Sequence, residues 1–191
     1  MKGEIILPID LTVGPNRVFC DDPTWDALAR DEFDVLWVVT AGKPSGTAAY
    51  AEELHSEQQR TAMESRLCAG CKGEPSRNRD GMLWILPLLD YADDTRWAGV
   101  ETVVPPMCHD CADDAKLRCP RLREGYAELR VQEAELIGVI GTLYPRPGEA
   151  GEPDPDKLVL FESSDLAYVV ARQLVCRLDK VTVITVGGMA S

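Results

Sequence analysis

Histidine, basic charge and long apolar runs are all scarce in this sequence of 191 residues. Only two histidines are present, His55 and His109. No segment approaches the roughly 20 consecutive apolar residues that a membrane-spanning helix needs, and the apolar run before Pro8 is too short for the core of a signal peptide. The sequence therefore predicts a cytoplasmic protein with no membrane partner.

Familiar catalytic motifs are also missing. The sequence contains no Gly-x-Ser-x-Gly elbow, no phosphate-binding glycine loop, no dinucleotide fingerprint and no His-Glu-x-x-His pair. These absences favour a binding protein over an enzyme, although they leave catalysis by an unfamiliar arrangement open.

Acidic residues outnumber basic ones by 32 to 20, which gives a formal net charge of −12. Such a charge repels nucleic acids and anionic membranes on average, so another protein is the favoured partner. Screening at physiological salt limits the reach of each charge to about 8 Å, and a local basic patch can therefore override the average. The candidates for such a patch are Arg77, Arg79, Arg118, Arg121 and Arg123.

The seven cysteines form the most informative pattern. Cys68 and Cys71 form one Cys-x-x-Cys pair, and Cys108 and Cys111 form a second. Two intervening residues allow both sulfurs of a pair to reach one ion from a tight turn, and two pairs complete the tetrahedral four-sulfur shell of structural zinc. We expect one structural Zn²⁺ at these four residues, with an iron site of the same geometry or two redox pairs as alternatives.

The other three cysteines are not paired in this way. Cys20 and Cys176 are expected to be small buried residues, which is the usual environment of an isolated free cysteine. Cys119 lies near the second pair and is also expected to be buried, although a contribution to the metal site stays open.

Apolar patterning and turn signals predict an α+β fold. Asp22 followed by Pro23 gives the N-cap and first residue of a helix that ends near Ala29. Longer helices are expected over 47–66, from the second cysteine pair onward, and over 164–178. The expected strands are 4–7, 35–40, 81–88, 100–104, 127–131, 136–144, 158–161 and 181–186, with a turn at 41–46.

The C-terminal third of the chain is expected to contain a hairpin, a surface loop and an amphipathic helix. Strands 127–131 and 136–144 are expected to form a hairpin, and the proline-rich and acidic stretch 145–156 is expected to be a surface loop. The helix over 164–178 is expected to be amphipathic and to pack on the sheet, because Leu166, Val170, Leu174 and Leu178 recur every four residues.

Composition divides the chain into three segments, expected to form one compact unit. These are an N-terminal α/β segment over 1–65, a zinc module over 66–125, and a segment over 126–191 that contains the hairpin, the acidic loop, the helix and the final strand.

The zinc module resembles a treble clef over roughly 66–120. Gly70, Lys72 and Gly73 give the first pair a flexible knuckle, whereas the second pair precedes helix-forming sequence, whose dipole would favour thiolates. The resemblance implies a knuckle, a β-hairpin and a helix whose first turn carries the second ligand pair. The stretch through CPRLREGYAELRV also resembles small zinc-binding proteins of actinobacteria, phages and mobile elements, which brings no activity with it.

Two enzyme families share parts of this pattern. HNH nucleases are treble clefs that carry a metal-activating histidine between the knuckles, but no histidine lies between Cys71 and Cys108, so a degenerate HNH-like module fits better. Nucleobase deaminases combine Cys-x-x-Cys with an upstream His-x-Glu. Here His55 and Glu57 would act with Cys108 and Cys111, although Met107 stands where that family has proline.

The sequence thus favours a non-catalytic regulatory or adaptor protein that is stabilised by zinc and binds another protein. A DNA-associated regulator that uses the arginines near the zinc site is one alternative, and a deaminase-like zinc hydrolase is the other.

Overall fold

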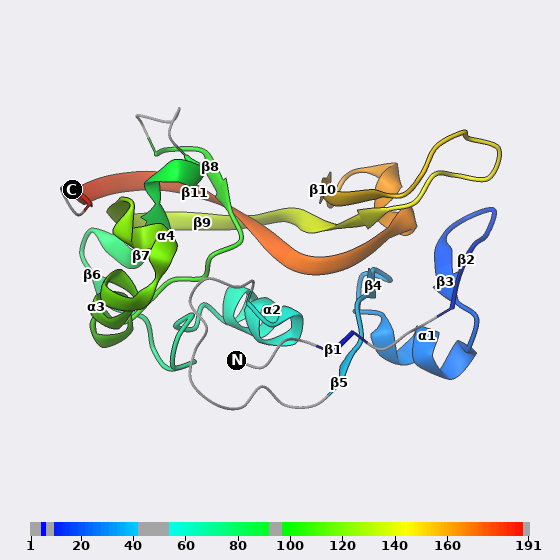
Figure 1. Ribbon diagram of the computed structural model, residues 1–191, viewed down its shortest axis with the longest axis horizontal. Coiled ribbons are helices and arrows are strands. Elements are labelled where there is room, and N and C mark those ends of the chain that lie inside the picture. Colours follow the sequence, from blue (N-terminus) through cyan, green and yellow to red (C-terminus); the bar gives the residue numbers. More distant parts are fainter. Residues whose placement is uncertain (1–4, 7–9, 42–53, 92–96, 189–191) are drawn as a thin grey trace. The chain divides into compact units, whose positions relative to one another are not determined.

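The computed structural model describes residues 5–6, 10–41, 54–91 and 97–188. Helices and strands are mixed along this part of the chain, as expected for an α+β protein (Figure 1). The chain forms two compact units. Unit 1 consists of Met1, Ser45–Leu136 and Cys176–Ser191, and unit 2 consists of Lys2–Pro44 and Ile137–Val175.

The sheet of unit 1 is built on the apolar strand β7 (Gly81–Pro87), which is buried from Met82 onward. It pairs antiparallel with the first part of β9 (Tyr126–Leu143). Within unit 1 the strands lie in the order β8, β11, β9, β7 and β6. The bounds of the other three are Arg77–Asn78 for β6, Val100–Thr102 for β8 and Val169–Gly187 for β11.

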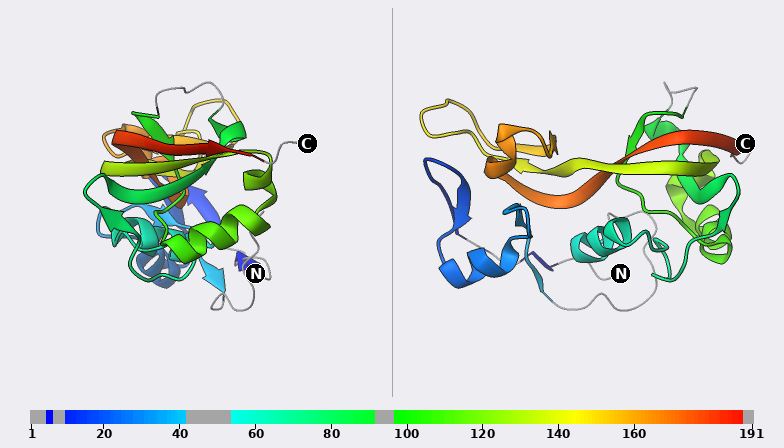
Figure 2. Two further views of the ribbon diagram at one scale, coloured as in Figure 1. Left: turned by 90° about the vertical axis from the view of Figure 1, so that its left-hand side faces the viewer. Right: turned by 180° about the vertical axis from the view of Figure 1, so that it is seen from behind.

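The helices of unit 1 are α2 (Ser56–Glu64), α3 (His109–Arg118) and α4 (Pro120–Arg123), and η1 (Leu88–Asp90) follows β7. Figure 2 shows α3 lying along one side of the strands. Successive side chains of β7 point to opposite faces of the sheet, so neighbouring residues pack in different places. Leu83 and Ile85 pack in one cluster with Ala112 and Ala115 of α3, whereas Trp84 is fully buried and its Nε1–H donates to the Val104 carbonyl at 2.8 Å.

Unit 2 is made of shorter elements around a smaller core. α1 (Pro23–Ala29) is capped by Asp22, whose carboxylate accepts from the amide of Thr24 at 2.8 Å, so the predicted helix start is confirmed. The short strands of its N-terminal part are β1 (Ile5–Ile6), β2 (Leu11–Val13), β3 (Val18–Cys20), β4 (Leu36–Trp37) and β5 (Thr40–Ala41).

The sheet of unit 2 has the order β4, β11, β9 and β10. β4 runs parallel to β11, and β10 (Asp154–Leu160) runs antiparallel to β9. The remaining strands form two-stranded pairs, β1 with β5 and β2 with β3. The stretch between β9 and β10 is mostly exposed, in agreement with the predicted surface loop.

The predicted hairpin of strands 127–131 and 136–144 is wrong, because β9 is one strand of 18 residues. The polar stretch 132–135, between the two expected strands, belongs to this strand. Its acidic side chains point to solvent and meet basic residues of β11: Glu135 pairs with Arg177 at 2.6 Å, and Glu133 pairs with Lys180. Charges that are exposed and paired do not end a strand.

The predicted amphipathic helix over 164–178 is also wrong. Ser164–Tyr168 forms the short 3₁₀ turn η2, and β11 begins at Val169. A spacing of four residues is a multiple of the strand period of two, so the recurrence of Val170, Leu174 and Leu178 fits either structure. Burial on both faces from Val169 to Ala171 and the many β-branched residues favour the strand.

Other expected elements appear with shifted ends. The helix expected over 47–66 begins at Ser56, and its part over 47–53 lies outside the described residues, as does most of the turn expected at 41–46. The strand expected over 35–40 is divided into β4 and β5. Among the described residues, no helix is long and apolar enough to cross a membrane.

Candidate metal centre

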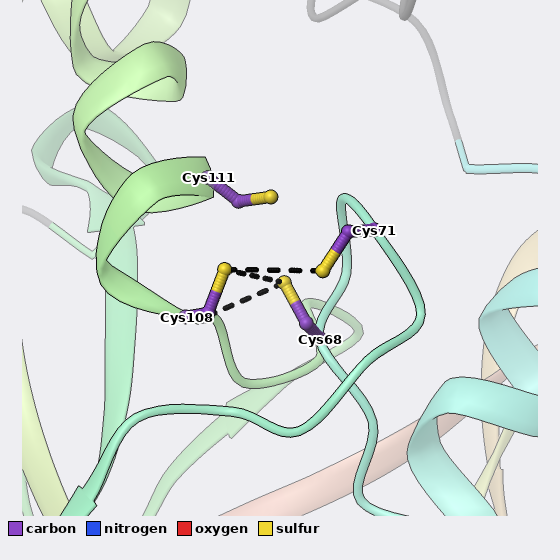
Figure 3. A group of neighbouring side chains, drawn as sticks. All are labelled: Cys68, Cys71, Cys108 and Cys111. Atoms are coloured by element: carbon purple, nitrogen blue, oxygen red, sulfur yellow. Dashed lines mark hydrogen bonds between the residues drawn. The ribbon is translucent and has the colours of Figure 1, made fainter.

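The structure brings together the four cysteines that the sequence singled out. The sulfurs of Cys68, Cys71, Cys108 and Cys111 all lie within 4.8 Å of one another (Figure 3). They come from two places far apart in the sequence, a turn that follows α2 and the start of α3. None of the seven cysteines forms a disulfide.

The first pair lies in a knuckle that backbone hydrogen bonds close. The amide of Cys68 donates to the Gly73 carbonyl at 2.8 Å, and the amide of Lys72 donates back to the Cys68 carbonyl at 3.0 Å. Lys72 adopts the left-handed conformation with φ of 61°, which reverses the chain and allows the Gly73 amide to reach the Cys71 sulfur at 3.4 Å.

The second pair is positioned by the helix start. Cys108 is the N-cap of α3, and Cys111 lies in its first turn. The approach to this helix is tied to the first pair, because the Ala69 amide donates to the Pro106 carbonyl at 2.8 Å and the Cys108 amide points at the Cys68 sulfur at 3.3 Å. One backbone hydrogen bond and one amide–sulfur contact therefore join the two cysteine pairs.

Two of the six sulfur–sulfur separations match the size of a zinc ion. A regular tetrahedron with Zn–S bonds of about 2.3 Å has edges of about 3.8 Å. The Cys68 and Cys108 sulfurs lie 3.7 Å apart, and the Cys71 and Cys108 sulfurs lie 3.8 Å apart. The four residues therefore fit a divalent ion that prefers four thiolates, and the donor set is the one that structural zinc uses.

The electrostatics of the cluster favour a bound cation. Burial raises the pKa of Cys68, but the backbone N–H groups of Cys108, Cys71 and Gly70 outweigh burial and lower that pKa to about 7. Burial raises the pKa of Cys108, and burial together with the neighbouring Cys108 and Cys68 sulfurs raises the pKa of Cys111. Four thiolates this close repel one another, so a cation is needed to hold all of them ionised.

Lys72 supplies positive charge beside the sulfurs. Its ammonium donates to the Ala69 carbonyl at 2.6 Å, which keeps it folded over the knuckle. Burial lowers the pKa of Lys72, and the charges of Cys68 and Cys71 oppose that shift. A four-thiolate zinc site carries a net charge of −2, which this ammonium partly offsets.

A second network supports the start of α3 and was not predicted from the sequence. His109 Nε2 lies 2.8 Å from the Ser76 hydroxyl and 3.3 Å from the Arg130 guanidinium. Arg130 is only 6% exposed and also donates to the Ser76 carbonyl at 3.1 Å. Alternation along β9 gave no sign of a buried arginine, because Leu129 and Val131 on either side are both fully buried.

The structure also locates the remaining candidate residues. His55 occupies the N-cap position of α2 and is buried, and it is not part of the cysteine group. The two remaining cysteines of unit 1, Cys119 and Cys176, are buried, and so is Cys20 in unit 2, as expected. Cys119 packs in the same core cluster as Cys68 but is not one of the four grouped sulfurs.

Comparisons with known proteins add no family to this description. No family model matches the chain, and no curated protein or solved structure matches it either. The functional argument therefore rests on the geometry of the site.

Proposed function

We propose that Cys68, Cys71, Cys108 and Cys111 bind one structural Zn²⁺ in a treble-clef-like module, and that the protein acts by binding another protein and is not an enzyme. The order of elements supports the treble-clef assignment. A knuckle, the β6–β7 hairpin and a helix with the second pair in its first turn follow one another along the chain.

The observation that carries the structural role is the complete ligand shell. Catalytic zinc sites keep one position open for water or substrate, whereas four cysteine ligands leave none. Among the described residues, the group contains four cysteines and neither histidine nor carboxylate. A deaminase-like site would use His55, Cys108 and Cys111 as its ligands. Here Cys108 and Cys111 are grouped with Cys68 and Cys71 instead of with His55.

The DNA-associated alternative has little support from the arginines. Arg118 forms an ion pair with Asp114 at 2.6 Å, Arg121 pairs with Asp90, and Arg123 donates to the Leu117 carbonyl at 2.8 Å. Arginines engaged with acidic groups or carbonyl oxygens offer less positive potential to phosphates, which weakens the DNA-associated alternative at three of its five candidate residues. A protein partner fits the net charge of −12 better.

Metal analysis tests the first part of this proposal. We expect one zinc per chain by mass spectrometry in the wild type and in His55→Ala, and its loss in Cys68→Ser. If zinc is instead lost in His55→Ala and kept in Cys68→Ser, the deaminase-like alternative is favoured and a deaminase assay is the next experiment. Iron in place of zinc would refute the assigned metal.

Partner binding is tested separately. The tagged chain, crosslinked in the cells that encode it, should yield a stoichiometric protein partner that Cys108→Ser loses and His55→Ala retains. Retention on a DNA column that falls steeply with salt, in the absence of a protein partner, would favour the DNA-associated regulator.

A further inference from the structure

The last part of β11 differs from the rest of the charged surface. Residues 181–187 have the sequence VTVITVG and carry no charge. All seven are exposed or half-exposed, so neither face of this segment is covered by the described part of the chain. The exposed fractions are 42% for Val183, 48% for Ile184 and 57% for Val186. Exposed apolar residues of this density in one strand indicate a binding surface.

Among the described residues, one backbone edge of this segment also has no strand partner. β9 lies on one side of β11 (Figure 1). On the other side, β8 pairs with Cys176–Leu178, and the Gly99 amide donates to the Leu178 carbonyl at 2.7 Å. No other described strand pairs with β11 beyond Leu178. Unpaired N–H and C=O groups along an apolar strand form a template for another strand.

We propose that this edge binds the same edge of a second copy of the chain, so that two β11 strands pair antiparallel about a twofold axis. Such an axis, perpendicular to the sheet, places residues of equal parity opposite each other. With the axis at Ile184, this residue faces its own copy and Thr182 faces Val186. With the axis at Val183, Thr182 faces Ile184. Both registers pair β-branched residues, a favourable combination, and bring no like charges together.

Charge selects a second copy over other occupants. Two chains of charge −12 repel each other over most of their surfaces, so self-association requires an uncharged surface. Residues 181–187 form such a surface, whereas a basic partner would gain more from the acidic surface elsewhere. A single strand pair buries little area, so we expect a reversible dimer that depends on concentration. This inference does not depend on the metal or on the proposed adaptor role.

Sedimentation equilibrium over a range of protein concentrations tests the dimer. The wild type should dimerise, and Ile184→Lys should weaken the dimer at least tenfold, because it places a charge, and in one register two facing charges, in the apolar edge. Leu117→Lys is the matched control, since Leu117 is a 71% exposed residue of α3 outside the edge. It should dimerise like the wild type. Zinc content and thermal unfolding, measured on each variant, separate a failed fold or metal site from a failed interface.

Amide hydrogen exchange gives a second readout. Protection confined to 181–187 should increase with protein concentration in the wild type and not in Ile184→Lys. A wild type that stays monomeric, or a dimer that survives Ile184→Lys, overturns the proposal. Protection of 181–187 that does not change with concentration overturns it too, because the chain would then cover its own edge. If Ile184→Lys loses its metal, Val186→Lys replaces it with the same expected result.

Discussion

The two units each contain one polar cross-link beside an apolar core, and the two cross-links differ in kind. Unit 1 has four cysteines over a cluster that includes Leu83 and Ala112. Unit 2 has an ion pair between Asp26 and Arg30 beside the cluster of Val18, Cys20, Ala29, Leu36 and Val170. The first cross-link requires an ion from outside, whereas the second is complete within the chain.

The ion pair of unit 2 is well satisfied. Arg30 contacts both carboxylate oxygens of Asp26, at 2.8 and 2.9 Å, and also donates to the Val18 carbonyl at 2.7 Å. The Cys20 amide also donates to the Asp26 carboxylate, at 2.9 Å. We therefore expect the two units to respond to different perturbations, unit 1 to metal removal and unit 2 to the loss of a paired charge.

Metal removal should have the largest effect and should be confined to unit 1. Structural zinc contributes roughly 10–16 kcal/mol of apparent binding free energy in small peptides, which is comparable with the stability of a whole domain. Chelation or Cys108→Ser should abolish amide protection in α3 and β7 but leave α1 and β3 protected in hydrogen exchange. Cys119→Ala, which changes a buried cysteine outside the group, should keep the metal. Protection of α3 in the metal-free protein would contradict the stapling role.

Asp26→Asn should have the next largest effect on stability. This effect should be confined to unit 2, whereas metal removal affects unit 1. The substitution removes the carboxylate closest to Arg30 and leaves that of the exposed Asp34, 3.5 Å away, so we expect a cost at or below the about 3–5 kcal/mol of a broken buried pair. Urea unfolding should show this loss, with protection lost first in α1 and β3 and zinc content unchanged. Asp21→Asn, on an exposed neighbour, should change stability by less than about 0.5 kcal/mol. Equal effects of the two substitutions would show that the pair contributes little.

Gly70→Ala should weaken metal binding with less effect on the fold. A Cβ at Gly70 would lie 2.7 Å from the Cys111 sulfur, whereas a Cβ at Gly73 would lie 3.4 Å from the Cys71 sulfur. Overpacking typically costs about 1–3 kcal/mol, so we expect roughly a tenfold or greater loss of zinc affinity for Gly70→Ala. Competition with a chromogenic chelator measures it. Gly73→Ala is the matched control, and a similar loss in both variants would contradict this account.

Acid should produce the smallest of these effects, again in unit 2. Burial opposes ionisation of Asp26, but the hydrogen bond from Arg30 and the Cys20 amide outweigh it and hold the pKa of Asp26 below its usual range. Stability from this group is therefore present above its unfolded pKa of about 3.9 and is lost as pH falls through the lower folded value. The stability difference between wild type and Asp26→Asn should shrink below pH 4 in urea titrations. If the stability difference between wild type and Asp26→Asn does not change with pH, the effect of the substitution comes from packing and not from the charge of Asp26.

Local chemistry made part of this molecule predictable. Asp22 and Pro23 define the start of α1, and the Cys-x-x-Cys spacing identified the two halves of the sulfur cluster, because a cap and each cysteine pair depend on residues close in sequence. Longer-range choices were not predictable. Whether 169–178 is helix or strand depends on the pairing with β8 and β4, which periodicity alone does not contain.

The same limit applies to side chains around the site. Arg130 was not singled out because its role depends on Ser76, which lies 54 residues away in the sequence. His109 lies beside Cys108 and is exposed, but it also contacts Ser76. Contacts between distant segments decide such roles, and a single sequence without a structure does not reveal them.

The nested connectivity of the two units has a consequence for synthesis on the ribosome. Unit 1 requires 45–136 and then 176–187, while unit 2 requires 2–44 and then 137–175. Neither unit can be completed when its first segment emerges, so the usual order of domain-by-domain folding is not open to this chain. All four cysteines of the candidate metal centre leave the ribosome before either long strand is finished. Ion capture can thus precede sheet closure, and zinc supply during translation would then govern the yield of folded protein.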